Sequence, residues 1–393
     1  MYRICIINNL NSLIDLNRVD DVEYLKSLNL TKSTLGSKEP SKHFIIKYDK
    51  KGKHDEITGL FRSCVIYDKK LVCYSPQKSV SFEKLSGDIY SIEEFVEGTM
   101  INMYYLNGEW NLSTRSVIGA DGSFYEKETT FKTMFLDCKD YISLDYNVLN
   151  KKYCYSFLIQ HPKNRIVKRI CTPTLYLCGV YEIIDDIELK IYTVNVYDEA
   201  QRIQNQLPQQ LLKLRTPFLH GAGDIDLVNV YRDLYQYSNT VRYDIMGIVI
   251  KDRNGSRAKF RNPVYEYVRK LRGNQPKLQY QYLVLRHTGK VKEFLRYYPE
   301  YRPYFTRYRE LVHLYTSNLY KYYVECFIRH ERPMLEFPYE YRNHMIGLHK
   351  LYIRENLKEK NHSKKSITFR DAVEYVNKLE PPRLMYSLNY KAH

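Results

Sequence analysis

Basic and aromatic side chains are concentrated in the last third of this 393-residue sequence. Residues 251–393 hold 30 Lys and Arg against 14 Asp and Glu, together with 19 of the 40 tyrosines, whereas residues 1–250 carry 31 groups of each sign. The whole formal net charge of +16 therefore lies in this region, and its densest stretch contains Arg269, Lys270 and Arg272. Cationic groups neutralise phosphates and tyrosine rings can stack on bases, so the pattern predicts a surface that binds a polyanion. By composition the partner is nucleic acid, an acidic protein face or anionic lipid.

Other motifs that could do chemistry have the wrong spacing. The glycines in 119–122 and 221–223 do not form a phosphate-binding loop, which needs a longer glycine spacing followed by a lysine. His344 and His349 are five residues apart, so they would not share a helix face as a metal-binding pair does. The eight cysteines include no C-x-x-C pair. We therefore expect no metal and no cofactor.

Short runs rich in Val, Ile, Thr, Tyr and Phe predict β-strands within the first 255 residues. They cover 63–67, 71–74, 99–105, 154–160, 174–181, 190–196 and 245–250. Asn107-Gly108, between two such runs, predicts a tight β-hairpin. These strands are the elements that must position any site in this part of the chain.

The pattern becomes helical after residue 290, where apolar and aromatic residues recur three and four apart from Phe305 to Tyr322. We expect a second helix at about 340–357, and an exposed loop from Lys358 to Ser366. The change of pattern predicts two domains, a mixed domain at 1–275 and a basic, Tyr-rich helical domain at 276–393.

A last helix is expected to begin at Thr368, because Asp371 three residues later would complete a capping box, and to end at Pro381-Pro382. The sequence has no run of about 18 apolar residues, and its first residues lack the length of a signal-peptide core. We therefore expect a cytoplasmic protein that does not contact a membrane.

Several segments between residues 55 and 285 follow one another in a recognisable order. They include Arg62-Ser63, Phe95-Val96-Glu97-Gly98, Ser113-Thr114-Arg115, Phe157-Leu158, Met246-Gly247-Ile248-Val249 and Lys259-Phe260-Arg261. Their order and spacing resemble the phage-type ATP-dependent RNA ligases, a family of covalent nucleotidyltransferases, and the basic tail resembles ligase-related proteins of large DNA viruses. The resemblance implies an α+β nucleotidyltransferase domain with antiparallel sheets and a nucleotide cleft, followed by an all-helical C-terminal domain.

In that family, the lysine of a K-x-[DE]-G motif attacks the α-phosphate of the nucleotide and becomes adenylylated. Here Glu97 and Gly98 match the acidic residue and the glycine, but Phe95 stands at the lysine position. Leu158 and Met246 stand where two glutamates would hold the ribose or the metal. The basic residues of the pattern are preserved: Lys259 and Arg261 stand where two cations contact the phosphates, and Arg62 stands where an arginine follows the first strand.

The resemblance therefore implies a nucleotidyltransferase fold that binds RNA and has no catalytic residue and no metal. The residues expected to bind a nucleotide or RNA in the degenerate pocket are Arg62, Phe95, Glu97, Arg115, Lys259 and Arg261, and those expected on the RNA backbone are Arg269, Lys270 and Arg272. RNA is the expected partner, together with viral or host RNA-processing or translation proteins, in the host cytoplasm or a viral factory. The pocket could read an RNA end or cap.

Three alternatives stay open at this stage. The protein could be an active RNA ligase with a relocated nucleophile, for which Lys84 and Lys127 are the candidates, although neither precedes an acidic-Gly pair. Phe95 could stack on a base or simply fill a core, and Lys259 and Arg261 could pair with nearby carboxylates. The tail helices could instead serve as a scaffold that packs on a protein partner.

Overall fold

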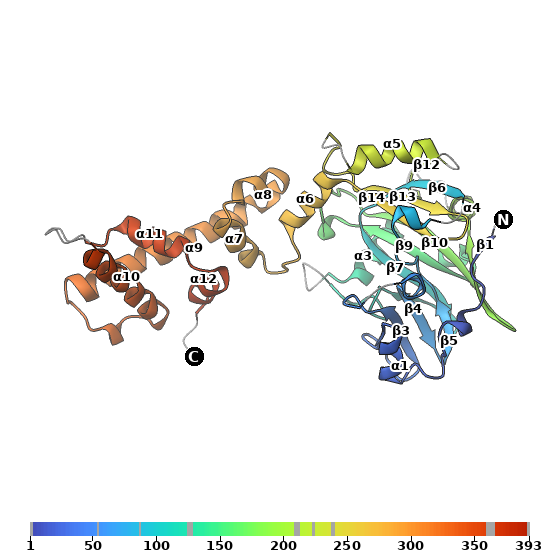
Figure 1. The fold of residues 1–393 in the computed structure, drawn as a ribbon, viewed down its shortest axis with the longest axis horizontal. Helices are drawn as coiled ribbons and strands as arrows, with labels where there is room; N and C mark the ends of the chain where they lie inside the picture. The colour runs from blue at the N-terminus through green and yellow to red at the C-terminus, as the bar shows by residue number, and fades with distance from the viewer. Residues whose placement is uncertain are drawn as a thin grey trace. The chain divides into compact units, whose positions relative to one another are not determined.

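The computed structural model describes residues 3–52, 55–85, 88–123, 129–207, 213–221, 225–236, 240–358 and 366–390. The chain forms two compact units, Met1–Lys270 and Leu271–His393. The first unit is built on three antiparallel sheets and the second on helices (Figure 1). The predicted fold class is thus confirmed, and the units divide at residue 270, where the sequence led us to expect a boundary at 275.

The largest sheet of the first unit has six strands. Their order is β1 (Arg3–Ile7), β11 (Leu189–Val194), β10 (Thr174–Asp185), β9 (Tyr153–Gln160), β7 (Thr99–Leu106) and β8 (Glu109–Ser113). Every residue of β9 is buried because both faces of the sheet are covered. Strands β7 and β8 form the predicted hairpin, in which Asn107 and Gly108 adopt positive φ angles of 53° and 86°.

Two four-stranded sheets complete the first unit. One has the order β12 (Leu219–Gly221), β6 (Ile89–Glu94), β13 (Gly247–Asp252) and β14 (Arg257–Arg261). The other has the order β2 (Leu30–Ser33), β3 (His43–Tyr48), β4 (Cys64–Tyr67) and β5 (Lys70–Cys73). All seven predicted strands are therefore present, as β4, β5, β7, β9, β10, β11 and β13.

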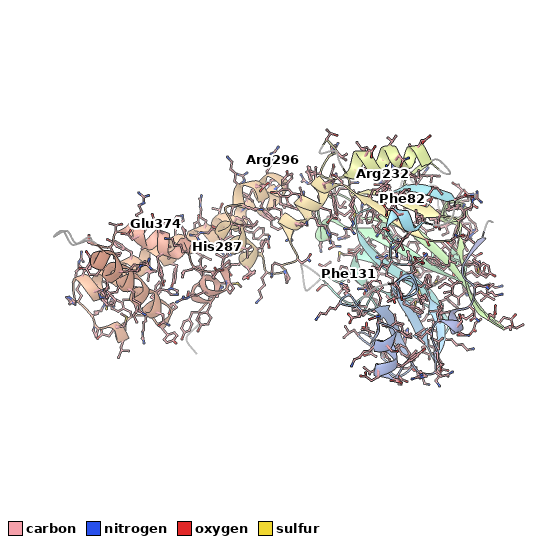
Figure 2. The ribbon with its side chains drawn as sticks, viewed as in Figure 1. Phe82, Phe131, Arg232, His287, Arg296 and Glu374 are labelled. Carbon is pink, nitrogen blue, oxygen red and sulfur yellow. The ribbon has the colours of Figure 1, made fainter. Side chains whose placement is uncertain are left out.

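Helices are interspersed among these strands along the chain. They are α1 (Val22–Ser27), α2 (Glu56–Leu60), α3 (Phe131–Tyr141), α4 (Val196–Gln204), α5 (Ile225–Gln236) and α6 (Pro263–Arg272), the last of which runs into the second unit. Helices α3 and α4 pack on one face of the large sheet. Val228 and Tyr235 of α5 pack on the β6–β13–β14 sheet, and Phe82 contacts Phe260 there with ring centroids 5.4 Å apart (Figures 1 and 2). Because α5 covers one face of this sheet, a functional site on the sheet has to use the opposite face.

The second unit consists of α7 (Leu278–His287), α8 (Val291–Tyr297), α9 (Arg302–Tyr323), α10 (Tyr339–Lys358), α11 (Phe369–Asn377) and α12 (Pro381–Leu388). The two long predicted helices are confirmed as α9 and α10, and Thr368 and Asp371 form the predicted capping box of α11. The expectation that the last helix ends at the prolines was wrong, because α11 ends at Asn377 and α12 begins at Pro381. Proline is tolerated in a first helical turn, where its missing N–H has no partner to lose. Of the predicted loop, residues 359–365 lie outside the described residues.

Five of the tail tyrosines build part of the core of this helical unit. Tyr282, Tyr298, Tyr315, Tyr323 and Tyr341 are buried, and Tyr315 stacks on Tyr341 with ring centroids 4.8 Å apart. Cationic side chains such as Arg296 instead project from the helices into solvent (Figure 2). In the described part of the chain, no helix has the length and apolar character needed to span a membrane.

Candidate phosphate-binding cleft

The register of the β6–β13–β14 sheet brings the predicted site residues together. Val249 pairs with Glu93 on one side and with Lys259 on the other, and Gly247 pairs with Arg261. Phe95 directly follows β6, and its backbone N–H donates to the Gly247 carbonyl over 2.9 Å. Because side chains alternate along a strand, every second residue of β14 from Arg257 onward points away from the α5 core.

Phe95 and the cations of β14 are in direct contact. The Nζ atom of Lys259 lies 4.5 Å from the centre of the Phe95 ring, and the guanidinium carbon of Arg261 lies 5.5 Å from the same centre. A cation over an aromatic face is attracted by the electron density of the ring. The ring that replaces the expected lysine thus supports two phosphate-binding candidates.

Lys259 is partly buried among like charges. In the described part of the chain it forms no ion pair, and its charged neighbours are Arg257, Arg62 and Arg261. Burial, followed by repulsion from these three guanidinium groups, lowers the pKa of Lys259 to about 5. The free site therefore has a surplus of positive potential that an anion would relieve.

Two arginines beside Lys259 are held by backbone carbonyls instead of carboxylates. Arg62 donates to the Pro76 carbonyl over 3.4 Å, and Arg257 donates through Nε to the Gln77 carbonyl over 2.7 Å. Burial lowers the pKa of Arg62 to about 10, with Arg257 as the next contribution. The sequence prediction missed Arg257, although its alternation with Lys259 and Arg261 along one strand was a readable signal.

Arg115 lies at the margin of this cluster. Its guanidinium donates to the Tyr48 carbonyl over 3.1 Å and its guanidinium carbon stands 4.3 Å from the centre of the Tyr48 ring. Its charge also contributes to lowering the pKa of Arg62. We use the name cation cluster for Arg62, Arg115, Arg257, Lys259 and Arg261.

Arg257 also lines a cavity between the six-stranded sheet and the β12–β6–β13–β14 sheet. The six-stranded sheet contributes Cys178 and Tyr181 to its wall, and the four-stranded sheet contributes Glu93 and Lys251. Lys251 and Glu93 form an ion pair of 2.7 Å. Through Arg257, the cation cluster therefore reaches a cavity that has both polar and apolar walls.

Glu97 has a structural position beside this cluster. Its carboxylate accepts hydrogen bonds from the backbone N–H groups of Val167 and Lys168 at 3.1–3.2 Å, and from the Tyr265 hydroxyl. Burial raises the pKa of Glu97 and these hydrogen bonds oppose the rise. The side chain of Glu97 holds the loop after β9 against the β6–β7 connection.

The two positions where the resemblance expects glutamates are apolar in the structure as well. Leu158 is buried with Val96 and Tyr176, and it lies so close to Gly98 that a Cβ on that glycine would meet its Cδ2 atom at 2.1 Å. Met246 lines a cavity of about 230 Å³ with Phe95 and Lys168. Among the described residues, no group of three or more His, Cys, Asp and Glu side chains could hold a metal ion.

The three predicted backbone-binding residues have different surroundings. Arg269 is exposed on α6 and pairs with Glu266 over 3.1 Å, and the same carboxylate also pairs with Arg261. Lys270 is exposed. Arg272 is buried and donates to the Tyr301 hydroxyl over 3.2 Å, so its guanidinium is turned into the helical unit. We therefore leave Arg272 out of the proposed surface.

The two alternative nucleophiles considered from the sequence do not enter the cluster. Lys84 is exposed, lies 3.7 Å from Glu56 and lines a separate cavity beside α2. Lys127 lies outside the described residues. The amine nitrogen that the structure places beside Phe95 is that of Lys259.

The chain has the antiparallel sheets that the resemblance to nucleotidyltransferase domains implies, and part of its sequence is similar to an RNA ligase. Two curated relatives are similar in sequence. An RNA ligase of Rhodothermus phage RM378 is 31% identical over 122 residues, 29% of this chain and 27% of that protein. An immediate-early protein ICP-46 homologue of Invertebrate iridescent virus 3 is 24% identical over 252 residues, 61% of this chain and 49% of that protein.

This chain therefore spans less than half the length of either relative. Among solved structures, an archaeal ATP-dependent RNA ligase has a TM-score of 0.41 and 13% identity, over 75% of this chain and 78% of that one. No family model matches the chain.

Proposed function

We propose that this protein is an RNA-binding relative of RNA ligases whose cleft holds RNA phosphates and transfers no nucleotide. The observation that carries the proposal is the pairing of Phe95 with Lys259 and Arg261, which replaces a nucleophilic amine by an aromatic support for two cations. A phenyl ring cannot form a phosphoramidate bond, so position 95 has no covalent chemistry to offer.

The side of Phe95 that contacts the cation cluster favours phosphate over metal. Carboxylate oxygens are the ligands that Mg²⁺ prefers, and Leu158 and Met246 supply none. Arg62 and Arg257 instead present positive charge that no described carboxylate neutralises through an ion pair, and the Lys259 amine beside them can take up a proton when a phosphate binds. Such a site repels a divalent cation and attracts a phosphate that arrives without one.

Exposed cations extend this binding surface within the first unit. Arg269 and Lys270 stand on the last turns of α6, which follows β14 directly. Arg261 and Arg269 share Glu266 as their partner, so an RNA phosphate could replace the carboxylate for one of them. We assign Arg261, Arg269 and Lys270 to contacts with the RNA backbone.

The two viral relatives support a viral setting for this proposal. In this proposal the protein acts in viral RNA metabolism in the host cytoplasm or a viral factory, as a subunit of an RNA-processing or translation assembly. The cleft would read an RNA end or cap, and residues 276–393 would form the separate helical domain expected from the sequence. No membrane partner enters the proposal.

One observation favours a second candidate function, that of an active nucleotidyltransferase. The Lys259 amine is the nitrogen beside Phe95, and its lowered pKa leaves it uncharged near neutral pH. A neutral amine can attack an α-phosphorus, forming an N–P bond while pyrophosphate leaves and the amine loses a proton. In this candidate Lys259 would be the relocated nucleophile, acting on ATP with an added divalent metal.

Equilibrium binding of RNA to the full chain tests the proposal. A fluorescent oligoribonucleotide should bind, and its affinity should fall steeply with salt because cations and phosphates release counterions when they meet. With 6–10 phosphate contacts, the affinity should fall by about 10³–10⁵ between about 50 and 200 mM salt. RNA binding that does not respond to salt, or no binding at low salt, would refute the proposal.

A further inference from the structure

The helical unit carries an exposed aromatic groove that is separate from the candidate phosphate-binding site. Its floor and walls are formed by the segment before α7 and by one face of α12, which packs beside α7 (Figure 1). The residues that matter below are Pro276, Lys277, Tyr280, Tyr386 and Tyr390, and we call this the tyrosine groove. It encloses about 790 Å³.

Two exposed rings, one in this groove and one beside it, contrast with the buried tyrosines of the same unit. Tyr386 is 60% exposed and Tyr339, the first residue of α10, is 52% exposed. Tyr339 stacks on Tyr390 with ring centroids 5.4 Å apart and an angle of 28° between the planes. Tyr386 meets Tyr390 edge to face at 5.7 Å. The three rings form a continuous aromatic surface that is held in place by its own contacts.

The charges around the groove are positive. Lys277 lines it, and none of the described lining residues is acidic. Arg383 is exposed on α12 one turn before Tyr386, and the guanidinium carbon of Arg342 lies 5.9 Å from the centre of the Tyr339 ring. The whole unit Leu271–His393 carries 23 Lys and Arg against 12 Asp and Glu. The occupant should therefore be anionic and should present flat apolar faces.

We propose that the tyrosine groove binds single-stranded RNA by stacking bases on Tyr386 and Tyr390 while Lys277 and Arg383 contact the phosphates. Single-stranded RNA offers the flat faces of its bases for stacking and the negative charge of its phosphates for the cations. An acidic peptide offers negative charge without flat aromatic faces. A base-paired RNA hides its faces in the helix and would not use the groove. The inference rests on the RNA binding proposed above and adds a second contact surface, in a different unit.

Three variants of the full chain test the stacking. Tyr386→Ala removes the exposed ring, Tyr386→Phe keeps the ring without its hydroxyl, and Tyr304→Ala is the matched control, because Tyr304 is 55% exposed on α9 and does not line the groove. Binding of a labelled oligouridylate should weaken by about 5-fold or more in Tyr386→Ala and stay near the original value in the other two. Binding of a duplex RNA should not depend on Tyr386. Thermal unfolding of each variant checks that the fold is kept.

Failure of this inference can be distinguished from failure of the cleft proposal. If Lys259→Met weakens oligouridylate binding while Tyr386→Ala matches the original protein, the cleft binds RNA and the tyrosine groove does not. Equal losses for single-stranded and duplex RNA in Tyr386→Ala would also overturn the stacking inference. Photocrosslinking with thiouridine RNA gives a test without substitutions, because the crosslinked peptide should contain Tyr386 or Tyr390. Crosslinks confined to the first unit would contradict the proposal.

Discussion

The Nζ atom of Lys259 lies 4.5 Å from the centre of the Phe95 ring, so the two residues form one contact across the β6–β13–β14 sheet. Arg261 approaches the same ring at 5.5 Å. Phe95, which stands where the nucleophilic lysine was expected, therefore contacts the two residues that match phosphate-binding cations. It also places Lys259 among three guanidinium groups, which makes the cluster sensitive to any change in charge.

Replacing Lys259 by methionine should weaken RNA binding and change its salt dependence. Methionine keeps most of the side-chain volume but removes the charge that we assign to a phosphate. We expect a loss of about tenfold in affinity and a salt slope smaller by about one counterion. Lys84→Met is the matched control, because Lys84 is exposed and lies outside the cluster. An unchanged salt slope in Lys259→Met would argue against a phosphate contact at this residue.

RNA affinity should fall as the pH rises through neutrality. Lys259 has a pKa of about 5 in the free protein, and a bound phosphate raises this pKa, so binding takes up a proton. The phosphodiesters of RNA stay charged around neutral pH, so they do not contribute to this pH dependence. Between about pH 6 and pH 8 we expect the RNA affinity to fall by up to about tenfold per pH unit, the limit set by uptake of one proton.

Titrations of the original protein and Lys259→Met against an RNA without terminal phosphates measure this coupling. The difference between the two slopes reports Lys259 alone, because other groups are common to both proteins. Identical slopes would show that Lys259 does not change its protonation on binding.

Restoring a lysine at position 95 should not restore nucleotide transfer. Phe95→Lys supplies an amine, but Leu158 and Met246 still lack the two carboxylates that the resemblance expects at these positions to help hold a divalent metal. Incubation of this variant with labelled ATP and Mg²⁺ should give no covalent product after denaturing electrophoresis. Covalent labelling of Phe95→Lys would mean that the rest of the site supports nucleotide transfer and that Phe95 alone prevents it.

Acid should destabilise the helical unit through His344. This imidazole is buried and hydrogen-bonded to Tyr375 at 3.1 Å and Ser387 at 3.0 Å, and burial lowers its pKa to about 4. The unfolded chain binds a proton near pH 6.5 and the folded chain near pH 4, so stability rises with pH between these values and is lost on acidification. Denaturant unfolding at several pH values should show a loss of about 1–3 kcal/mol across this window. A His344→Asn variant should have a flatter profile, and a slope equal to that of the original protein would exclude His344 as the cause.

The sequence predicted the elements whose patterns are local. The hairpin at Asn107 and Gly108 follows from turn chemistry, the capping box of α11 from the spacing of Thr368 and Asp371, and the long tail helices from periodicity. Helix α12 was not predicted, because a proline such as Pro381 can follow the end of one helix or occupy the first turn of the next.

Burial and register limited prediction of the site. Strand pairing brings Phe95, Lys259 and Arg261 together as expected, and it adds Arg257, which no motif marked. A charged residue in a sequence does not reveal whether it faces solvent, so Arg272 was expected on RNA although it is buried against Tyr301. Glu97 matched a motif, yet its carboxylate is fully used by backbone N–H groups and Tyr265. The predicted roles of these residues in RNA binding stay predictions.

The most direct test of the central claim is a covalent labelling experiment on the unaltered protein. The chain is incubated with each of the four α-labelled nucleoside triphosphates and Mg²⁺ or Mn²⁺, denatured and separated by electrophoresis, with an active RNA ligase as the positive control. We predict no label on the protein with any nucleotide, under conditions in which it binds RNA. A labelled band that disappears in Lys259→Met would contradict the account and identify Lys259 as a nucleophile.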